Sequence, residues 1–192
     1  MASIFSNKTA EQIAAMTTDE IAAAIASDWA AITASQITNL SATQWAAAVP
    51  AGLASIPVLA LQAVSSDNFR TFSVDQLIAL NAKQAAVFTV EQLNGLSGEK
   101  FNALTTTQFA AFTTAQAAAI TADRMAEIDV ADLAALSTGV INRLTNEAVG
   151  AITADKIGAI TAKQAAALTA DQVHALGTAA IAALETADLR AL

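Results

Sequence analysis

The residues that could do chemistry are few and scattered along the chain. The 192 residues include one histidine, His174, and no cysteine, so the sequence holds no thiolate ligand, cysteine nucleophile or disulfide. A metal site or a catalytic dyad at His174 would need further ligands, and the sequence places none beside it. The 17 acidic residues are spread along the chain, and no phosphate loop, nucleophile elbow or zinc motif occurs. We therefore expect no catalytic residue, no metal site, no cofactor and no enzyme activity.

The composition narrows the classes of partner. Apolar residues make up 55% of the chain and charged residues 14%, which is unlike a disordered acidic tail. A net charge of −8 with nine scattered bases argues against binding to nucleic acid. The segment Ala46 to Val64 is uncharged but is interrupted by Pro50, Gly52 and Pro57, so we expect no membrane span. The N-terminus lacks the basic and apolar regions of a classical signal peptide.

The chain must instead be understood through an internal repeat of eight residues. From Thr9 to Leu192 it divides into 23 octads without an insertion. Position 8 is large and apolar in 21 of the 23 octads and position 5 in 20, while position 1 is Ser, Thr, Asp or Asn in 18. Such regularity is typical of repeat architectures rather than of a single globular fold.

The octad predicts a helix that breaks in every repeat. One continuous helix would turn about 80° too far per octad, so its apolar residues would spiral around it and form no common face. Ser or Thr at position 1 with Gln or Glu at position 4 is a capping box, which starts a new helix. Ten octads carry both members, those that open at Thr9, Thr17, Thr33, Ser41, Ser73, Thr89, Thr105, Thr113, Thr161 and Thr169.

We therefore predict an all-α solenoid of about 23 very short helices over residues 9–192. A β-solenoid is the alternative, but positions 5 and 8 would then face opposite sides of a strand. Several features recur every 16 residues, among them the departures from Ala at position 7 and the charged pair Glu127 and Arg143. This period predicts two octads, or 16 residues, per coil.

The segment from residue 29 to residue 66 is the irregular part of the array. It contains no charged residue, and the octads at Val49 and Pro57 lack a capping residue. A bend or altered turn is one explanation, and an interaction surface around Pro50 and Pro57 is the other. Trp29 and Trp45, both at position 5, are expected in the core, with an exposed ligand platform as the alternative.

The two ends of the array differ. Residues 1–8 form a lead ahead of the first octad and could cover the first layer of the solenoid. At the other end the last octads keep their apolar residues, and a bare layer of a solenoid exposes apolar surface. We therefore expect self-association through a C-terminal layer that includes Leu184, Leu189 and Leu192.

Runs such as L-T-A-D-Q-V-H-A-L (168–176) and I-T-A-K-Q-A-A-A-L (160–168) carry a resemblance. They resemble the Ala/Thr-rich L-T-x-x-Q-h-x-A repeats of large bacterial secreted and cell-surface proteins. The resemblance implies an extracellular or cell-surface location, with export by a type I route that needs no N-terminal signal. It brings no catalytic motif with it.

The expected function is a structural or protein-interaction module, with protein or a second copy of the chain as its partner. The alternative is a ligand-binding module that presents one face of the repeat to a glycan, an apolar ligand or ice. Ice binding is disfavoured because the threonines are explained as caps and are often replaced. An exposed aromatic row would favour the ligand-binding module.

Overall fold

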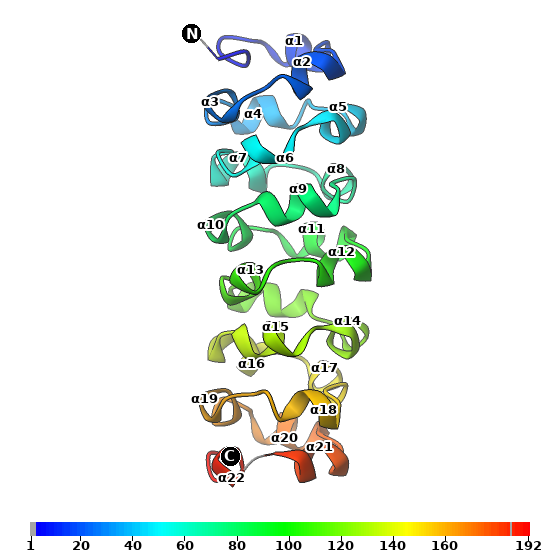
Figure 1. Cartoon of the computed structure of the whole chain (residues 1–192), viewed down its shortest axis with the longest axis vertical. Helices are drawn as coiled ribbons and strands as arrows, with labels where there is room; N and C mark the ends of the chain where they lie inside the picture. Colours follow the sequence, from blue (N-terminus) through cyan, green and yellow to red (C-terminus); the bar gives the residue numbers. More distant parts are fainter. Residues whose placement is uncertain (1–2, 185) are drawn as a thin grey trace. The chain divides into compact units, whose positions relative to one another are not determined.

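The computed structural model describes residues 3–184 and 186–192, and each octad in these residues contributes one short helix. There are 22 α-helices and one 3-10 helix in the described part of the chain, each of four to six residues, and no strand. The all-α solenoid is therefore confirmed, and the β-solenoid is wrong. Figure 1 shows the succession of short helices.

Contacts divide the chain into two compact units, Met1–Leu104 and Thr105–Leu192. The octad phase continues across this boundary, and the single array over 9–192 stays a prediction. The helices of the first unit are α1 (Ala10–Ala14), α2 (Thr18–Ala22), α3 (Ala26–Trp29), α4 (Ala34–Ile37), α5 (Ala42–Ala47), α6 (Pro50–Leu53), α7 (Val58–Gln62), α8 (Ser66–Phe69), α9 (Val74–Ala79), α10 (Ala82–Ala85), α11 (Val90–Gly95) and α12 (Gly98–Asn102).

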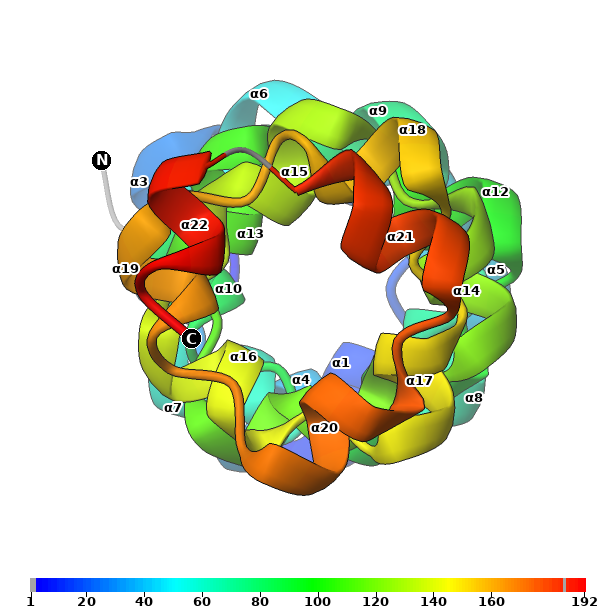
Figure 2. The same cartoon turned by 90° about the horizontal axis from the view of Figure 1, so that it is seen from below.

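The second unit is built in the same way, and Figure 2 shows its last helices, in orange and red, following one another around a common interior. Its helices are α13 (Thr106–Ala110), the 3-10 helix η1 (Thr114–Ala119), α14 (Ala122–Glu127), α15 (Val130–Ala135), α16 (Thr138–Arg143), α17 (Asn146–Gly150), α18 (Ala154–Ile157), α19 (Ala162–Ala165), α20 (Ala170–Ala175), α21 (Thr178–Ala183) and α22 (Thr186–Leu189).

The helices begin where the capping boxes predict. In nine of the ten predicted boxes the hydroxyl accepts the backbone N–H of position 4 and the position-4 side chain accepts the N–H of position 1. At Thr113 the hydroxyl instead donates to the Oε1 of Gln116, and this octad forms η1. Asn81 forms a further box with Gln84, which the Ser/Thr pattern had not included.

The helices end without a glycine in the left-handed conformation. After α9, Leu80 (φ −71°, ψ 139°) and Asn81 (φ −84°, ψ 169°) are both extended, and the next helix starts at once. Among the described residues the one positive φ outside glycine is at Asn7, and no glycine has a positive φ. The turn therefore needs no residue of special conformation, which explains why the octads carry few Gly or Asn turn signals.

The coil is larger than the predicted two octads. Helices pack on helices three octads away: α2 on α5, α4 on α7, α14 on α17, and α17 on α20. Hydrogen bonds from position 4 reach octads four away, as from Gln44 to Ile13. One coil thus takes between three and four octads, and the 16-residue coil is wrong. The predicted pairing of Glu127 with Arg143 fails with it, because α14 packs on α17 whereas α16 packs on η1 and α19.

The 16-residue period has a different physical origin. Trp29 on α3 and Trp45 on α5 lie 16 residues apart, and their rings stack with centroids 5.7 Å apart. Figures 1 and 2 place α3 and α5 on opposite sides of the first unit. Octads two apart therefore meet across the interior through their position-5 side chains, and they do not stack along the coil.

Positions 5 and 8 supply the core of both units. Ile13, Leu53, Leu93, Leu133 and Ile157, all at position 5, have no exposed surface. The small residues between them let neighbouring helices approach closely. A Cβ at Gly150, for example, would lie 3.1 Å from the carbonyl oxygen of Ala175 on α20.

Position 4 links successive coils through a buried glutamine. The Oε1 of Gln44 accepts the N–H of Ser41 at 2.7 Å, and its Nε2 donates to the carbonyl oxygens of Ile13 (3.0 Å) and Met16 (2.8 Å). We call this set of three hydrogen bonds a glutamine bridge. Five further buried glutamines form it within one unit: Gln76, Gln84, Gln92, Gln164 and Gln172. The half-buried Gln36 makes the same three hydrogen bonds.

The bridge matters because very short helices leave most of their polar backbone groups unpaired. A helix leaves its first four N–H and last four C=O groups without intrahelical partners, and helices of four to six residues consist almost entirely of such ends. One glutamine satisfies an N–H of its own helix and two carbonyls of a helix four octads earlier. Apart from the half-buried Gln36, these glutamines are at most 3% exposed, so water does not replace them.

The caps give a first prediction. Thr161→Ala should lower the free energy of unfolding by about 0.5–2 kcal/mol, because the Thr161 hydroxyl accepts the N–H of Gln164. Thr113→Ala should cost less, because that hydroxyl caps no backbone N–H. Chemical denaturation of the two variants measures which substitution lowers the free energy of unfolding more. Amide exchange should place the loss near the mutated octad, and uniform loosening of the whole chain would contradict a stack of local units.

The glutamine bridge gives a second prediction. Gln76→Glu keeps the acceptor for Ser73 but replaces the donor to the carbonyls of Trp45 and Ala48, so it should destabilise by about 1–3 kcal/mol or more at neutral pH. Gln12→Glu is the matched control, since Gln12 is exposed and its hydrogen bonds lie within its own capping box. Thermal unfolding compares the two, and equal effects would show that the bridge contributes nothing.

Candidate functional site

The two tryptophans belong to the core. Trp29 and Trp45 have no exposed surface, and their rings stack with an interplanar angle of 18°. The alternative of an exposed ligand platform is therefore wrong for both rings. They continue a chain of ring contacts of 4.7–5.1 Å through the first unit that also includes Phe5, Phe72, Phe69 and Phe88.

The two prolines do not break the array. Pro50 is the first residue of α6, and Pro57 takes the cap position of α7 with φ −57° and ψ 137°. Proline suits these positions because its fixed φ agrees with the start of a helix and its missing N–H leaves no donor unpaired. Pro50 is half-buried and Pro57 is exposed. The octads at Val49 and Pro57 both form their helices, α6 and α7, so the missing caps require no bend in the array.

An apolar surface surrounds these prolines. Leu59 is 72% exposed and Val49 43%, and Ile25, which precedes the uncharged segment, is 63% exposed. Ile25 and Val49 stand where most octads have Ser or Thr, so neither provides a side-chain cap. The sequence analysis named Pro50 and Pro57 but missed Ile25. An isoleucine at position 1, where most octads have a capping residue, was the signal that could have identified it.

A groove opens beside Ile25 and Val49. It encloses about 350 Å³ between Ala22–Ala26 and the start of α6, where Val49, Ala51 and Gly52 line it. Position 4 of this octad is Gly52 instead of glutamine, and the ring of Trp29 explains why. A Cβ at Gly52 would lie 2.5 Å from the Cδ1 of Trp29, so no side chain fits.

The residues proposed for a C-terminal interaction surface are placed differently from one another. Leu184 is 6% exposed and belongs to the core, so it offers little surface to a partner. Leu189 on α22 and Leu192 are 45% and 47% exposed. These two side chains remain available to a partner.

The lead residues pack as a further octad would. Phe5 is fully buried against Trp29, and the Nε2 of Gln36 donates to the carbonyls of Phe5 (2.8 Å) and Lys8 (3.0 Å). The carboxylate of Asp28 accepts the N–H groups of Ile4 and Ile25, both at 2.9 Å. Burial works to raise the pKa of Asp28, but these hydrogen bonds outweigh it and hold the pKa below its usual value. Residues 1 and 2 of the lead lie outside the described residues.

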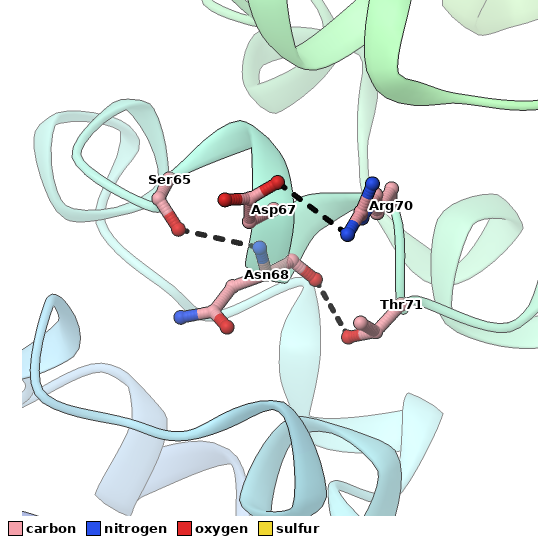
Figure 3. A network of polar contacts seen from close by, with 5 residues as sticks. All are labelled: Ser65, Asp67, Asn68, Arg70 and Thr71. Atoms are coloured by element: carbon pink, nitrogen blue, oxygen red, sulfur yellow. Dashed lines mark hydrogen bonds and ion pairs between the residues drawn. The ribbon is translucent and has the colours of Figure 1, made fainter.

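The described residues include one histidine and an ion pair at α8. His174 is exposed on α20, and no group of three or more His, Asp or Glu residues in the described ranges could hold a metal ion. The carboxylate of Asp67 lies 3.6 Å from the guanidinium of Arg70 (Figure 3). Beside this pair, the backbone N–H of Asn68 donates a capping hydrogen bond to the hydroxyl of Ser65. Both charged side chains are mostly exposed, so this pair contributes little to stability.

Asp132 on α15 is a buried carboxyl at position 4. It is 5% exposed and accepts a hydrogen bond from the hydroxyl of Thr106 at 2.7 Å. Burial raises its pKa above the usual value, and the Thr106 hydrogen bond offsets this in part. The sequence search did not single out Asp132, although a carboxylate at a position elsewhere occupied by buried glutamine was a signal.

Comparison with known proteins supports the repeat. Residues 125–162, from α14 to the start of α19, match the ALTTAQ repeat family. The matched segment covers less than half of the chain. No curated protein matches the chain. Within the described residues, no helix has the length and apolar character needed to cross a membrane.

Asp132 gives a prediction about pH. Because its pKa is raised in the folded state, its neutral form stabilises the fold, and this contribution is lost as the pH rises from about 4 through the raised pKa. Asp132→Asn keeps an oxygen for Thr106 and stays neutral, so its stability relative to the original protein should increase toward neutral pH. Urea unfolding at several pH values measures this difference.

Thr106→Val is the companion variant. Removing the hydroxyl takes away the hydrogen bond that favours the ionised carboxyl, so the loss of stability with rising pH should become steeper. A difference between Asp132→Asn and the original protein that does not change with pH would contradict the buried carboxyl as its source.

Proposed function

We propose that this chain is a structural or protein-interaction repeat module without catalytic activity. The observation that carries the proposal is the use of its polar side chains. The buried glutamines are engaged in bridges between coils, and the threonines and serines of position 1 cap helices. This leaves a scaffold that can present the side chains of positions 2, 3 and 6 to a partner, because most of them are exposed or half-buried.

The module is proposed to belong to a bacterial secreted or cell-surface protein. The match to the ALTTAQ repeat at residues 125–162 supports the repeat itself, and the proposed location rests on the resemblance of the octads to repeats of such proteins. The letters of A-L-T-T-A-Q follow the order of octad positions 7, 8, 1, 2, 3 and 4, as in Ala167 to Gln172 (A-L-T-A-D-Q). Export is tested by following the chain in the culture fluid and in the cells of its bacterial host, and by looking for export genes beside its own.

A ligand-binding module is the second candidate. The groove beside Gly52 and the exposed Ile25 and Leu59 favour an apolar ligand over a glycan, because they offer aliphatic surface and few polar groups. Ice binding has less support, because the threonine hydroxyls at position 1 are occupied as caps in boxes such as those of Thr89 and Thr169.

Self-association is the form of protein interaction that the chain can be tested for directly. Leu189 and Leu192 expose apolar surface on the second unit, so light scattering at high concentration should show an oligomer. Leu189→Glu and Leu192→Glu should weaken it by placing a charge in the contact. Val130→Glu is the matched control, since Val130 is exposed to the same extent as Leu189 but lies on α15. A monomer at all concentrations, or equal weakening by Val130→Glu, would reject this surface.

A further inference from the structure

A second cavity lies between the lead and α2, in the part of the first unit where the lead runs beside the first helices (Figure 1). It encloses about 420 Å³, and its lining includes Ile4, Ser6 and Lys8 of the lead and Met16, Glu20 and Ala23 of the first two octads. The lining thus combines two charges of opposite sign with a hydroxyl and apolar side chains. In this it differs from the groove beside Val49, which no charged side chain lines.

Both charged residues of the lining depart from the repeat. Counted back by one octad, Lys8 stands at position 8, where the 23 octads have a large apolar residue or alanine. Glu20 is the position-4 member of the capping box that opens at Thr17, and the other nine Ser/Thr boxes all have glutamine there. Residues that break a repeat rule without serving the fold are expected at a functional site.

The scaffold does not need either charge. The Oε2 of Glu20 accepts the N–H of Thr17 at 2.8 Å, a hydrogen bond that the glutamines of the other boxes make without a charge. The lead is held through the backbone carbonyl of Lys8, which accepts the amide of Gln36 at 3.0 Å. The ammonium group takes no part in that contact. Both charges are therefore additions to a scaffold that would form without them.

The charged atoms also remain available to a ligand. The hydroxyl and the N–H of Thr17 both donate to the Oε2 of Glu20, and the Oε1 accepts no hydrogen bond from the described residues. Within the same residues the ammonium of Lys8 forms neither an ion pair nor a hydrogen bond. The hydrogen bond from the Thr17 backbone lowers the pKa of Glu20, and the charge of Lys8 adds to this effect. The cavity therefore holds a carboxylate and an ammonium group at neutral pH.

We propose that this cavity binds a small zwitterion, an amino acid with an aliphatic side chain. The carboxylate of the ligand pairs with Lys8, its ammonium group pairs with Glu20, and its side chain lies against Ile4 and Met16. An ion of a single sign would be attracted by one of the two residues and repelled by the other, whereas a zwitterion satisfies both. The volume of about 420 Å³ is in the range of about 300–1,000 Å³ for small-molecule sites. This inference goes beyond the scaffold function and does not depend on it.

Titration of the ¹⁵N-labelled chain with L-leucine as the probe tests the site. The backbone amide signals of Ile4, Met16 and Ala23 should shift and saturate. Leucinamide carries the ammonium group alone and N-acetyl-leucine the carboxylate alone. Each of them should bind at least roughly 2- to 5-fold more weakly than leucine, because an ion pair at a partly exposed site contributes modestly.

Two substitutions separate the charges. Lys8→Met and Glu20→Gln should each lower the affinity for leucine roughly 2- to 5-fold, and both variants keep the hydrogen bonds of the scaffold. Lys8→Met should not weaken leucinamide, and Glu20→Gln should not weaken N-acetyl-leucine, because each of these probes lacks the group that pairs with the replaced residue. A loss of affinity through a damaged fold would instead weaken all three probes together.

Two exposed residues outside the cavity supply matched controls. Lys83→Met on α10 and Glu91→Gln on α11 make the same chemical changes and should leave the affinity for leucine unchanged. The proposal is overturned if the signals of Ile4, Met16 and Ala23 show no saturable shift, or if the three probes bind equally. It is also overturned if Lys8→Met and Glu20→Gln lower the affinity for leucine no more than these controls do.

Discussion

The structure depends on satisfying the backbone of helices that are too short to satisfy themselves. A helix of four to six residues makes one or two internal hydrogen bonds, and isolated helices of this length do not persist in water. The buried glutamine at position 4 supplies what is missing at both ends, because its oxygen accepts one N–H and its nitrogen donates to two carbonyls. In the octads that carry this glutamine the same contact also joins coils, so one side chain supports both local helix formation and stacking.

Replacements at position 4 show how narrowly this geometry is set. Asn68, one methylene shorter, donates to the carbonyl of Leu40 alone. Lys156 reaches the carbonyls of Met125 and Ala126 but has no acceptor with which to cap its own helix. Glutamine has both the length and the two functions, which explains its recurrence at this position. Where the core contains Trp29, the ring takes the space of the side chain, and only Gly52 fits.

Much of the local structure could be predicted from the sequence, because caps act within one octad. Thr89 and Gln92 indicate a helix start without reference to any distant residue. The coil size could not be predicted, since the 16-residue period of Trp29 and Trp45 has the same appearance whether octads stack or meet across the core. The bridging role of Gln44 could not be predicted for a related reason. The capping box alone already explains a glutamine at position 4, so the sequence gives no sign that the same side chain also contacts another coil.

The uncharged segment and Ile25, which precedes it, depart from several rules of the repeat at once. Ile25 and Val49 give up caps, Gly52 gives up a bridge, and Trp29 keeps a buried donor without a partner. Each departure costs stability, and bridges such as that of Gln92 in the following octads would have supplied the standard solution. Departures from locally consistent choices concentrate at functional sites, because selection there acts on something other than stability. Missing caps and a missing bridge coincide at α3 and α6, which argues that the surface between these helices is under functional constraint.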